Sequence, residues 1–402
     1  MAYHKFKLGD LVEQYDEINT NGEFSDIDDL QGINSNKFFQ ECKSNKNDID
    51  LYRYRICRKG MFSYNKATSR NGEKISIAYR KGNDCLVSPS YYCFKVKDED
   101  VLCSEYLDIW FKRPIFDRYA RFNSWGSATE FFTFDDFCNT EIMLPSIDEQ
   151  RKIVNEYHVI SNRIKLLEDI NKNLENMALL TYQTFFLDYI PYKDNLIETK
   201  NGIMPYGWNY MSLDDICVKI TDGSHYSPIE TENSIYPMLS VKDMGHYGFD
   251  YSSCKFMDRP DYLKMLSGDC VPLVDDILIA KDGSYLKEVF IVNEFKEQGI
   301  LSSIAIFRAD SKVIYPEILL YLLKSPRVLQ EVRDNYVTGS AITRIVLKNF
   351  KKLKLVIPPI EEQKRILPLL RTIRFQISNN HHEISVLNNL LKYQLSVLSK
   401  GV

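Results

Sequence analysis

LPSIDEQRKIV, at Leu144–Val154, returns 213 residues later as IPPIEEQKRIL, at Ile357–Leu367. Further matches follow in the same order. At the same offset, Gly126-Ser127-Ala128 matches Gly339-Ser340-Ala341 and Phe137 matches Phe350, and after a one-residue adjustment Lys112 and Pro114 match Lys324 and Pro326. Near the start of each copy, LGDLV at Leu8–Val12 matches LDDIC at Leu213–Cys217. Because self-similar blocks that recur in one order are the signature of a repeat, the sequence predicts an internal duplication.

A long helix is expected after each copy of the block. Alternating steps of four and three residues connect two seams, at Ile153, Tyr157, Ile160, Ile164, Leu167, Asn171, Leu174 and Ala178 and at Ile366, Leu370, Ile373, Ile377, Asn380, Ile384, Leu387 and Leu391. This spacing is typical of coiled coils. Asp148-Glu149 and Glu361-Glu362 favour helix starts, and Pro368 is expected to delay or kink the regular part of the second helix.

An antiparallel pairing of the two helices, about a pseudo-twofold axis, lets their apolar stripes cover each other. Asn171 occupies an a position and Asn380 a d position, and the offset places them symmetrically about residue 169, the middle of the helix. We hypothesise that they face each other and fix the helix register. The alternative is that each asparagine lies at the seam edge and reaches solvent separately.

The segments before the helices read as irregular domains. Short β-branched and aromatic runs are broken by turn signals such as Asn71-Gly72, Asp222-Gly223 and Asp282-Gly283, with a helix expected near 104–120 and 316–335. We therefore predict an α+β protein with two strand-rich mixed domains in tandem, separated by the helices. The predicted parts are a first domain at 1–145, a helix at 146–190, a linker at 191–207, a second domain at 208–358 and a C-terminal helix at 359–402.

Composition narrows the class of protein. A formal net charge of -4 argues against indiscriminate coating of polyanions but allows a local basic surface. We expect no membrane span, because no run approaches 18 apolar residues. Nine cysteines without a CxxC pair, behind an N-terminus without an apolar signal segment, predict reduced thiols in a cytoplasmic protein.

The strongest local sign of nucleic-acid binding is the stretch Leu51–Lys81. Only Glu73 opposes its cations, which are Arg53, Arg55, Arg58, Lys59, Lys66, Arg70, Lys74, Arg80 and Lys81. Its interleaved aromatic residues are Tyr52, Tyr54, Phe62, Tyr64 and Tyr79. Such cations contact phosphates or read guanine edges in the major groove. The alternative is a solvated charged face whose aromatic residues turn inward.

In the second copy, short polar side chains and cations gather at predicted turns. These candidates are Lys219, Thr221, Asp222, Ser224 and His225, then Ser240 and Lys242, then Lys281, Asp282, Ser284, Tyr285 and Lys287. A basic run follows, with Arg344, Lys348, Lys351, Lys352 and Lys354. These residues suit base-edge and phosphate contacts. For each turn residue an ordinary turn or cap role is the alternative, and for the run a solvated face.

No catalytic or metal site is predicted. The only Pro-Pro pair, Pro358-Pro359, lies between isoleucines and not in an amino-methyltransferase motif, and no P-loop occurs. Asp276 with Glu294 and Lys296 has nuclease-like spacing that a chain with 26% charged residues produces by chance. His381-His382 lacks two further ligands nearby.

The duplicated order of these blocks resembles the specificity subunit of type I restriction-modification systems, over essentially the whole chain. The second copy carries YGWNYMSLDDICVKITDGSH at 206–225, GSAITRI at 339–345 and VIPPIEEQKRI at 356–366. The first departs from the pattern, since LPSIDEQ replaces the Pro-Pro form and nothing after Leu8-Gly9-Asp10 matches ITDGSH.

The resemblance implies two target-recognition domains that each read half of a bipartite sequence in double-stranded DNA, joined by helices that act as spacer and docking surface. It implies modification subunits that carry the methyltransferase and restriction subunits that carry the translocase and nuclease. S-adenosylmethionine, ATP and Mg would bind to those partner subunits, and this chain would bind no cofactor. The alternatives are a coiled-coil scaffold joining two protein-binding domains, or a recognition subunit of another DNA-acting assembly.

Overall fold

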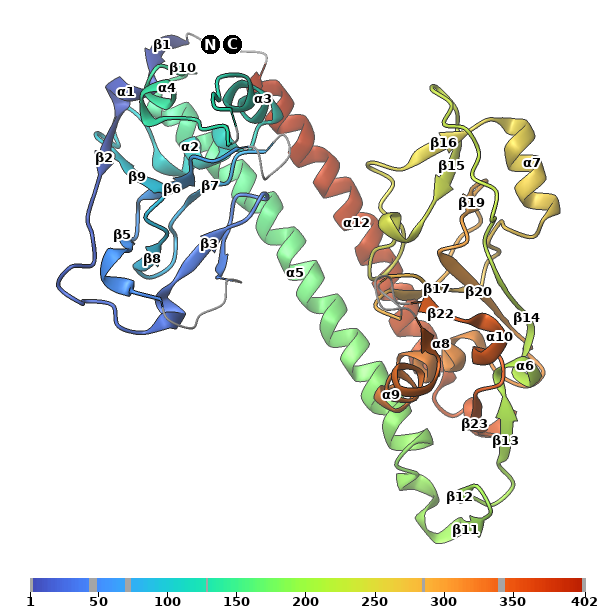
Figure 1. Cartoon of the computed structure of the whole chain (residues 1–402). Helices are drawn as coiled ribbons and strands as arrows, with labels where there is room; N and C mark the ends of the chain where they lie inside the picture. The colour runs from blue at the N-terminus through green and yellow to red at the C-terminus, as the bar shows by residue number, and fades with distance from the viewer. Residues whose placement is uncertain are drawn as a thin grey trace. The chain divides into compact units, whose positions relative to one another are not determined.

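The computed structural model describes residues 3–42, 49–68, 74–127, 129–283, 286–338 and 344–399. The chain divides into two compact units (Figure 1). Unit 1 contains Met1–Ile164 and Val386–Val402, and unit 2 contains Lys165–Ser385. Each unit therefore holds one globular domain together with parts of both long helices.

Unit 1 is a mixed domain around a four-stranded antiparallel sheet of order β2-β9-β6-β7. Its elements are β1 His4–Lys7, α1 Leu8–Leu11, β2 Val12–Tyr15, β3 Gln31–Ile33, β4 Phe39–Glu41, β5 Arg55–Cys57, β6 Phe62–Asn65, β7 Ile77–Tyr79, β8 Cys85–Val87, β9 Tyr91–Val96, α2 Ser104–Phe111, α3 Pro114–Phe122, α4 Phe134–Cys138 and β10 Glu141–Leu144. Strands β1 and β10 pair antiparallel and bring the two ends of the domain together.

Unit 2 has a four-stranded antiparallel sheet of order β14-β20-β17-β18. Its elements are β11 Leu196–Thr199, β12 Gly202–Pro205, β13 Asn209–Ser212, α6 Leu213–Ile216, β14 Cys217–Asp222, β15 Tyr236–Leu239, β16 Lys255–Met257, α7 Arg259–Ser267, β17 Ile277–Ala280, β18 Val289–Ile291, β19 Gly299–Ile300, β20 Ile304–Ala309, α8 Pro316–Lys324, α9 Pro326–Asn335, β21 Val337–Thr338, β22 Arg344–Ile345, α10 Leu347–Phe350 and β23 Lys354–Ile357.

The two sheets are the same arrangement built twice. In the order of the chain, β2, β6, β7 and β9 take the places that β14, β17, β18 and β20 take in unit 2. The terminal pair recurs as well, since β1 with β10 corresponds to β13 with β23. The predicted fold class, two strand-rich mixed domains in tandem with two long helices, is confirmed.

The helix expected inside each domain is broken into two. Predicted near 104–120, it is α2 and α3 in the structure, and that near 316–335 is α8 and α9. Both breaks fall directly before a proline, at Arg113 and Ser325, whose backbones are extended. Proline disfavours the helical conformation in the residue before it and suits the first turn of a new helix, which explains both corrections.

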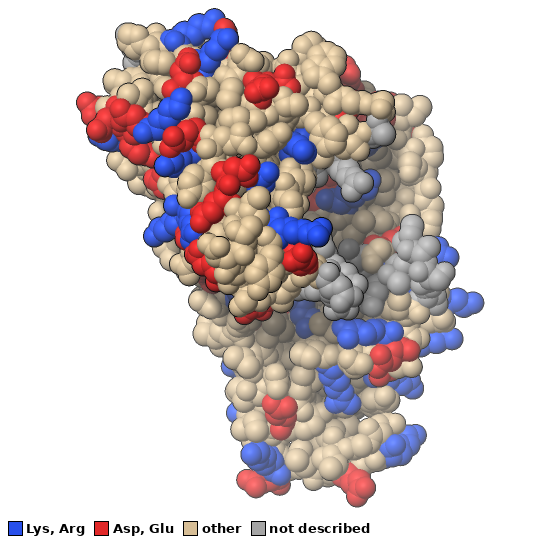
Figure 2. Space-filling model, turned by 60° about the vertical axis from the view of Figure 1, so that its left-hand side comes forward, with Lys and Arg blue, Asp and Glu red and all other residues tan. Residues whose placement is uncertain are grey.

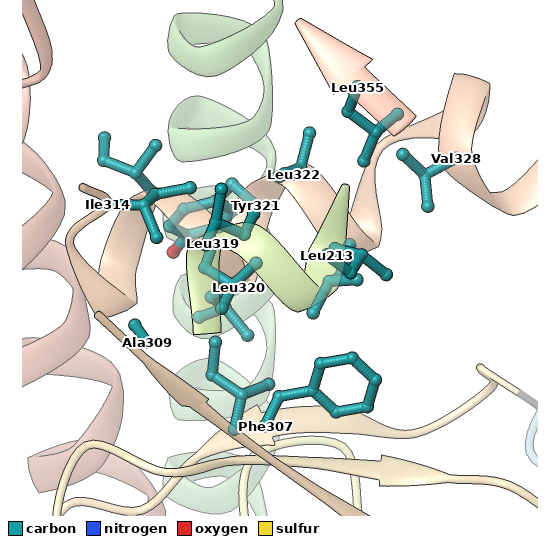
Figure 3. Packing of buried hydrophobic residues seen from close by; sticks show 14 of the residues in the cluster. Leu213, Phe307, Ala309, Ile314, Leu319, Leu320, Tyr321, Leu322, Val328 and Leu355 are labelled. Carbon is teal, nitrogen blue, oxygen red and sulfur yellow. The ribbon is translucent and has the colours of Figure 1, made fainter. Parts of the chain in front are cut away.

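The core of unit 2 surrounds α8. All residues of this helix except Lys324 are buried, so it is covered on every side, as its uniformly apolar sequence requires. Leu319 and Leu320 lie in one cluster with Leu213 of α6 and Phe307 of β20 (Figure 3). Full burial of each large apolar side chain contributes about 1.5–3 kcal/mol, so this cluster holds the helix against the sheet.

The first long helix, α5, runs over Ile147–Phe186, and the second comprises α11 at Ile360–Gln363 and α12 at Leu367–Ser399. None of the predicted seam residues in the two helices is exposed. The interruption before Leu367 agrees with Pro368, which cannot donate to the carbonyl of Lys364. Pro368 therefore delays the regular helix, as its position predicts.

The helices run antiparallel within unit 2. The Tyr192 hydroxyl, beyond the end of α5, donates to Glu362 Oε2 at 2.7 Å, just before α12 begins. Further along the same pair, Asn380 Nδ2 donates to Asn171 Oδ1 at 2.7 Å. In unit 1, Leu398 of α12 packs against a core that contains Val154 of α5. The Arg113 guanidinium donates to the Leu398 carbonyl at 2.9 Å and offsets the negative end of the helix dipole.

The two asparagines thus meet in the buried seam, where Asn171 is 0% and Asn380 4% exposed. Their role in register stays a prediction. Asn380→Leu alone is expected to lower the free energy of unfolding by about 1–3 kcal/mol, because it leaves the Asn171 amide buried without its partner. Replacing both residues with Leu is expected to restore stability and to loosen the choice of register.

Urea denaturation with light scattering checks this prediction. Val386→Leu, at an exposed position of α12, is the control and is expected to change stability by less than about 0.5 kcal/mol. A double variant that keeps the wild-type oligomeric state and helix register would show that the asparagines do not fix it.

A buried glutamine explains why the EQ block is written twice. Gln150 Oε1 accepts from the Cys103 backbone N–H at 3.0 Å, and its Nε2 donates to the carbonyls of Val101 and Pro145, both at 3.0 Å. Gln363 makes the same three kinds of bond in unit 2, to Tyr315, Val313 and Pro358, at 3.0, 2.8 and 2.9 Å. Each glutamine ties the start of its long helix to the loop before α2 or α8.

An ionic cluster attaches α5 to the domain of unit 2. Glu175 is buried and accepts from Lys324, from His246 Nε2 at 2.6 Å and from the Tyr247 hydroxyl at 3.2 Å. Burial alone would raise the pKa of Glu175, but the bonds from His246 and Lys324 outweigh it and lower the pKa to about 2. The carboxylate is therefore charged and fixes the helix to the loop that carries His246.

Candidate nucleic-acid interface

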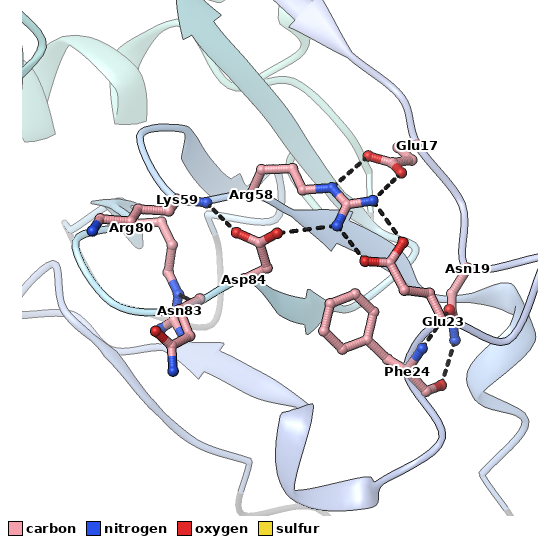
Figure 4. Close-up of polar contacts among 9 residues, drawn as sticks. All are labelled: Glu17, Asn19, Glu23, Phe24, Arg58, Lys59, Arg80, Asn83 and Asp84. Atoms are coloured by element: carbon pink, nitrogen blue, oxygen red, sulfur yellow. Dashed lines mark hydrogen bonds and ion pairs between the residues drawn. The ribbon is translucent and has the colours of Figure 1, made fainter.

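Acidic residues from other parts of unit 1 neutralise some of the cations in its basic stretch. Arg58, after β5, is enclosed by three carboxylates: Glu17 accepts from its Nε at 3.0 Å, Glu23 from Nη2 at 2.7 Å and Asp84 from Nη1 at 3.0 Å (Figure 4). The hydrogen bonds that Arg58 donates to Glu23 and Glu17 raise the pKa of its guanidinium. All of its guanidinium nitrogens are engaged, so this side chain organises the domain and is not available to a phosphate.

The other candidate cations in this stretch differ in whether a carboxylate pairs with them. Arg55 pairs with Asp16, and Arg53 pairs with Asp50 at 3.0 Å. Lys59 and Lys74 are exposed, and Arg70 lies outside the described residues. On the face drawn in Figure 2, Lys and Arg are interspersed with Asp and Glu and do not form one uniform basic area. Phe62 and Tyr64 are 0% exposed, so these two aromatic residues turn inward.

Arg58→Met is expected to lower the free energy of unfolding of unit 1 by about 1–3 kcal/mol, because three carboxylates lose a charged donor. The DNA affinity of the assembled complex should stay within about twofold. Urea denaturation and a binding titration measure the two effects, and Lys59→Met, at a neighbouring exposed lysine, is the control for stability. A tenfold loss of affinity at unchanged stability would instead make Arg58 a DNA contact.

In unit 2 the structure gathers several turn candidates at the end of β14. Lys281 Nζ lies 2.6 Å from Asp222 Oδ2, and His225 Nε2 lies 3.3 Å from the same oxygen. Gly223 leaves no room for a side chain, because a Cβ there would lie 2.3 Å from the carbonyl oxygen of Ile300. The Ser224 backbone N–H donates to that carbonyl at 2.8 Å. The ITDGSH segment is therefore fixed by backbone pairing and by one partly buried ion pair.

The remaining candidates of unit 2 are spread over other turns. Lys219 pairs with Asp269, and the Thr221 hydroxyl donates to the Asp222 carbonyl at 3.3 Å. Lys242 is exposed, and so is Lys287, which lies 3.9 Å from Glu288. Lys219, Lys242 and Lys287 do not join the cluster around Asp222, whereas the backbone of Arg344 pairs with that of Asp282, next to Lys281. Ser284 and Tyr285 lie outside the described residues.

The two domains contain the same junction between a strand end and a later loop. In unit 1 the Phe132 N–H donates to the Lys66 carbonyl at 2.8 Å, and in unit 2 the Ile345 N–H donates to the Lys281 carbonyl at 3.0 Å. Backbone bridges join Ala67 to Phe131 and Asp282 to Arg344. We call this place the strand–loop junction. It follows β6 in unit 1 and β17 in unit 2.

The sequence contained a signal for this junction. Lys281 follows Lys66 by 215 residues, close to the offset of the repeat, and Arg344 follows Phe131 by 213. Phe131 was not among the predicted site residues, because the offset pairs it with a residue of a different type. Only the backbone pairing shows that the two positions are equivalent.

The acidic residues whose spacing resembles that of a nuclease site take part in structural ion pairs. Asp276 is 0% exposed and accepts from Arg308 Nε and Nη2 at 2.7 and 2.8 Å, and Glu294 pairs with Lys296 at 2.8 Å. Within the described ranges, no group of three or more His, Cys, Asp or Glu side chains is placed to hold a metal ion. No described helix is long and apolar enough to cross a membrane.

A family model described as "Type I restriction modification DNA specificity domain" matches this chain twice, at residues 3–176 and 205–389. The chain belongs to this family. Each match covers one domain of the structure and a part of the long helix that follows it. The duplication that the repeated blocks predict is therefore a tandem pair of specificity domains, as the resemblance to type I specificity subunits implies.

Curated relatives carry corresponding names. The type I restriction enzyme MjaIX specificity subunit of Methanocaldococcus jannaschii is 25% identical over 301 residues, which are 73% of this chain and 67% of that protein. The MjaVIII specificity subunit of the same organism is 27% identical over 215 residues, 52% of this chain and 47% of that protein. This chain thus spans about two thirds of the first relative and about half of the second.

A solved structure has the same fold. The S subunit of a type I restriction-modification system from M. genitalium superimposes with a TM-score of 0.56 at 15% identity, covering 99% of this chain and 96% of that one. At this identity the likeness concerns the fold. In this chain, the candidate places for contact with DNA are the cluster around Asp222 and the two strand–loop junctions.

Proposed function

We propose that this specificity subunit reads a bipartite sequence in double-stranded DNA, one half-site with each domain. The observation that carries the proposal is the duplication: each half of the chain has one match to the specificity family and one copy of the same four-stranded sheet. Two equivalent readers in one chain suit a target with two parts. The long helices act as the spacer between the readers and as the docking surface for other subunits.

The chemistry of the proposed complex belongs to partner chains in the cytoplasm. Modification subunits would bind S-adenosylmethionine and methylate the DNA, and restriction subunits would use ATP and Mg to translocate and cut it. The acids with nuclease-like spacing support this division, because Asp276 is committed to Arg308 and Glu294 to Lys296. The chain itself would be a non-catalytic recognition subunit.

Sequencing of methylated bases tests the proposal. Cells that express this chain with its modification subunits should methylate one bipartite motif with a fixed gap, and cells with the modification subunits alone should not. Methylation that lacks a second half-site, or that does not depend on this chain, would contradict the proposal. A scaffold without DNA contacts further predicts that the purified complex is not retained on heparin.

A further inference from the structure

The strand–loop junction keeps one backbone in both domains while its side chains differ. In unit 1 the backbone of Phe131 bridges Ala67 on one side and Trp125 on the other. In unit 2 the backbone of Arg344 bridges Asp282 on one side and Thr338 on the other. The positions correspond through the offset of 213 residues. Two domains that read different sequences in one kind of ligand need a common backbone arrangement and different side chains. The strand–loop junction has both.

Each junction presents one cation whose charge is not neutralised, on opposite sides of the bridge. In unit 1 the Lys66 ammonium lies 5.6 and 5.5 Å from the ring centroids of Tyr92 and Phe131, and no carboxylate of the described residues pairs with it. In unit 2 the equivalent Lys281 is 9% exposed and pairs with Asp222. Its neighbour Arg344 is exposed and has no carboxylate partner within the described part of unit 2.

Exposed aromatic rings accompany the cation of unit 1. Trp125 is 69% exposed although its backbone is fixed by the bridge to Phe131, and Phe122, three residues earlier, is 80% exposed. Exposed large rings on fixed backbone are costly in water and suit contact with an apolar surface such as the methyl group of thymine. Lys66 can supply the hydrogen bond to a neighbouring base or phosphate.

The cations that the structure neutralises are poorer candidates. Arg58 is held by three carboxylates, Lys219 by Asp269 and Lys281 by Asp222. To bind DNA, each would have to give up a partner that it already has. Lys66 and Arg344 lose no such partner, and both lie at the position that the duplication repeats.

We propose that the strand–loop junction is the base-reading position of each domain, with Lys66 as the specificity-determining cation of the first half-site and Arg344 as that of the second. This inference rests on the proposed function. The forked guanidinium of Arg344 matches O6 and N7 of guanine, so the second half-site contains a guanine that Arg344 reads. Lys66, beside the ring of Phe131, reads a guanine edge next to a thymine.

The test uses the whole chain assembled with its modification subunits and a plasmid library of random sequence, followed by sequencing of methylated sites. The variants are Lys66→Met and Arg344→Met, with Lys66→Gln and Arg344→Gln as second substitutions that keep a polar end. The controls are Lys95→Met in unit 1 and Lys255→Met in unit 2, whose ammonium groups already pair with Glu13 and Glu230 at 2.8 and 2.9 Å.

We expect Arg344→Met to reduce discrimination at one guanine of the second half-site roughly ten- to hundredfold and to leave the first half-site intact. Lys66→Met should do the same to the first half-site alone. The controls should methylate the wild-type motif.

Three results would overturn the inference in distinguishable ways. A wild-type bipartite motif that both Met and both Gln variants reproduce without relaxation would overturn the inference and leave the proposed function standing. A wild-type complex without any bipartite motif would overturn both. Uniform weakening at every position of the motif would also overturn it, since that pattern belongs to phosphate contacts.

Discussion

Gln363→Leu is expected to lower the free energy of unfolding of unit 2 by about 3–5 kcal/mol, among the largest effects of any single substitution. Gln363 is 0% exposed, and its amide pairs with one backbone N–H and two backbone carbonyls, for which no other side chain among the described residues is a partner. Leucine fills a similar volume but leaves these groups buried without partners. Each such group costs about 1–3 kcal/mol, and part of the cost is recovered by relaxation.

Hydrogen exchange under increasing urea measures the effect separately in each unit. Gln150→Leu should destabilise unit 1 by a similar amount and leave unit 2 protected, because its three bonds repeat those of Gln363. The control is Gln330→Leu, at an exposed position of α9, with an expected change within about 0.5 kcal/mol. Equal effects of Gln363→Leu and Gln330→Leu would mean that the glutamine does not clamp the helix start.

The same glutamine shows what a repeated motif reveals and what it leaves hidden. The block around Gln150 and Gln363 predicts a duplication and the start of two helices, because order and spacing can be read along the chain. The reason for the glutamine could not be predicted, since two of the three backbone groups that it binds precede Gln363 by 48 and 50 residues. Tertiary partners of this kind leave no local pattern.

Periodicity predicted the long helices and their seam well, because a seam depends on residues three and four apart. Even the contact of Asn171 with Asn380 follows from the offset and from antiparallel pairing. The break before α3 was missed although Pro114 stands in the sequence, since the apolar pattern continues across it.

The basic stretch shows why charge along the sequence is a weaker guide. Arg58 looks free among neighbouring cations, but Glu17 and Glu23 come from a segment 41 and 35 residues away. Folding places acidic residues of the earlier segment against Arg53, Arg55 and Arg58, so part of the local excess of charge is neutralised. The sequence predicts only some residues of the strand–loop junction. Lys66, Lys281 and Arg344 are among the candidate DNA-binding residues, whereas Phe131 and Trp125 are not.

Four residues inserted into each long helix are expected to lengthen the gap of the DNA target and to preserve both half-sites. Suitable places are after Glu168 in α5 and after His382 in α12, which flank the contact of Asn171 with Asn380 on one side. Four residues add about 6 Å of helix and slightly more than one turn, so the apolar stripe keeps nearly the same direction. Since base pairs are about 3.4 Å apart, the gap should grow by about one to two base pairs.

Methylated-site sequencing of the complex measures the gap directly. Insertion into α5 alone is the matched control, because it shifts one stripe along the other and should abolish methylation of any fixed-gap motif. An unchanged gap with full activity after the double insertion would contradict the spacer role of the helices. A longer gap together with altered half-sites would mean that the helices also orient the readers. Lengthening with both half-sites intact requires that each domain reads DNA as an independent unit, which is the arrangement that we propose for the duplicated domains.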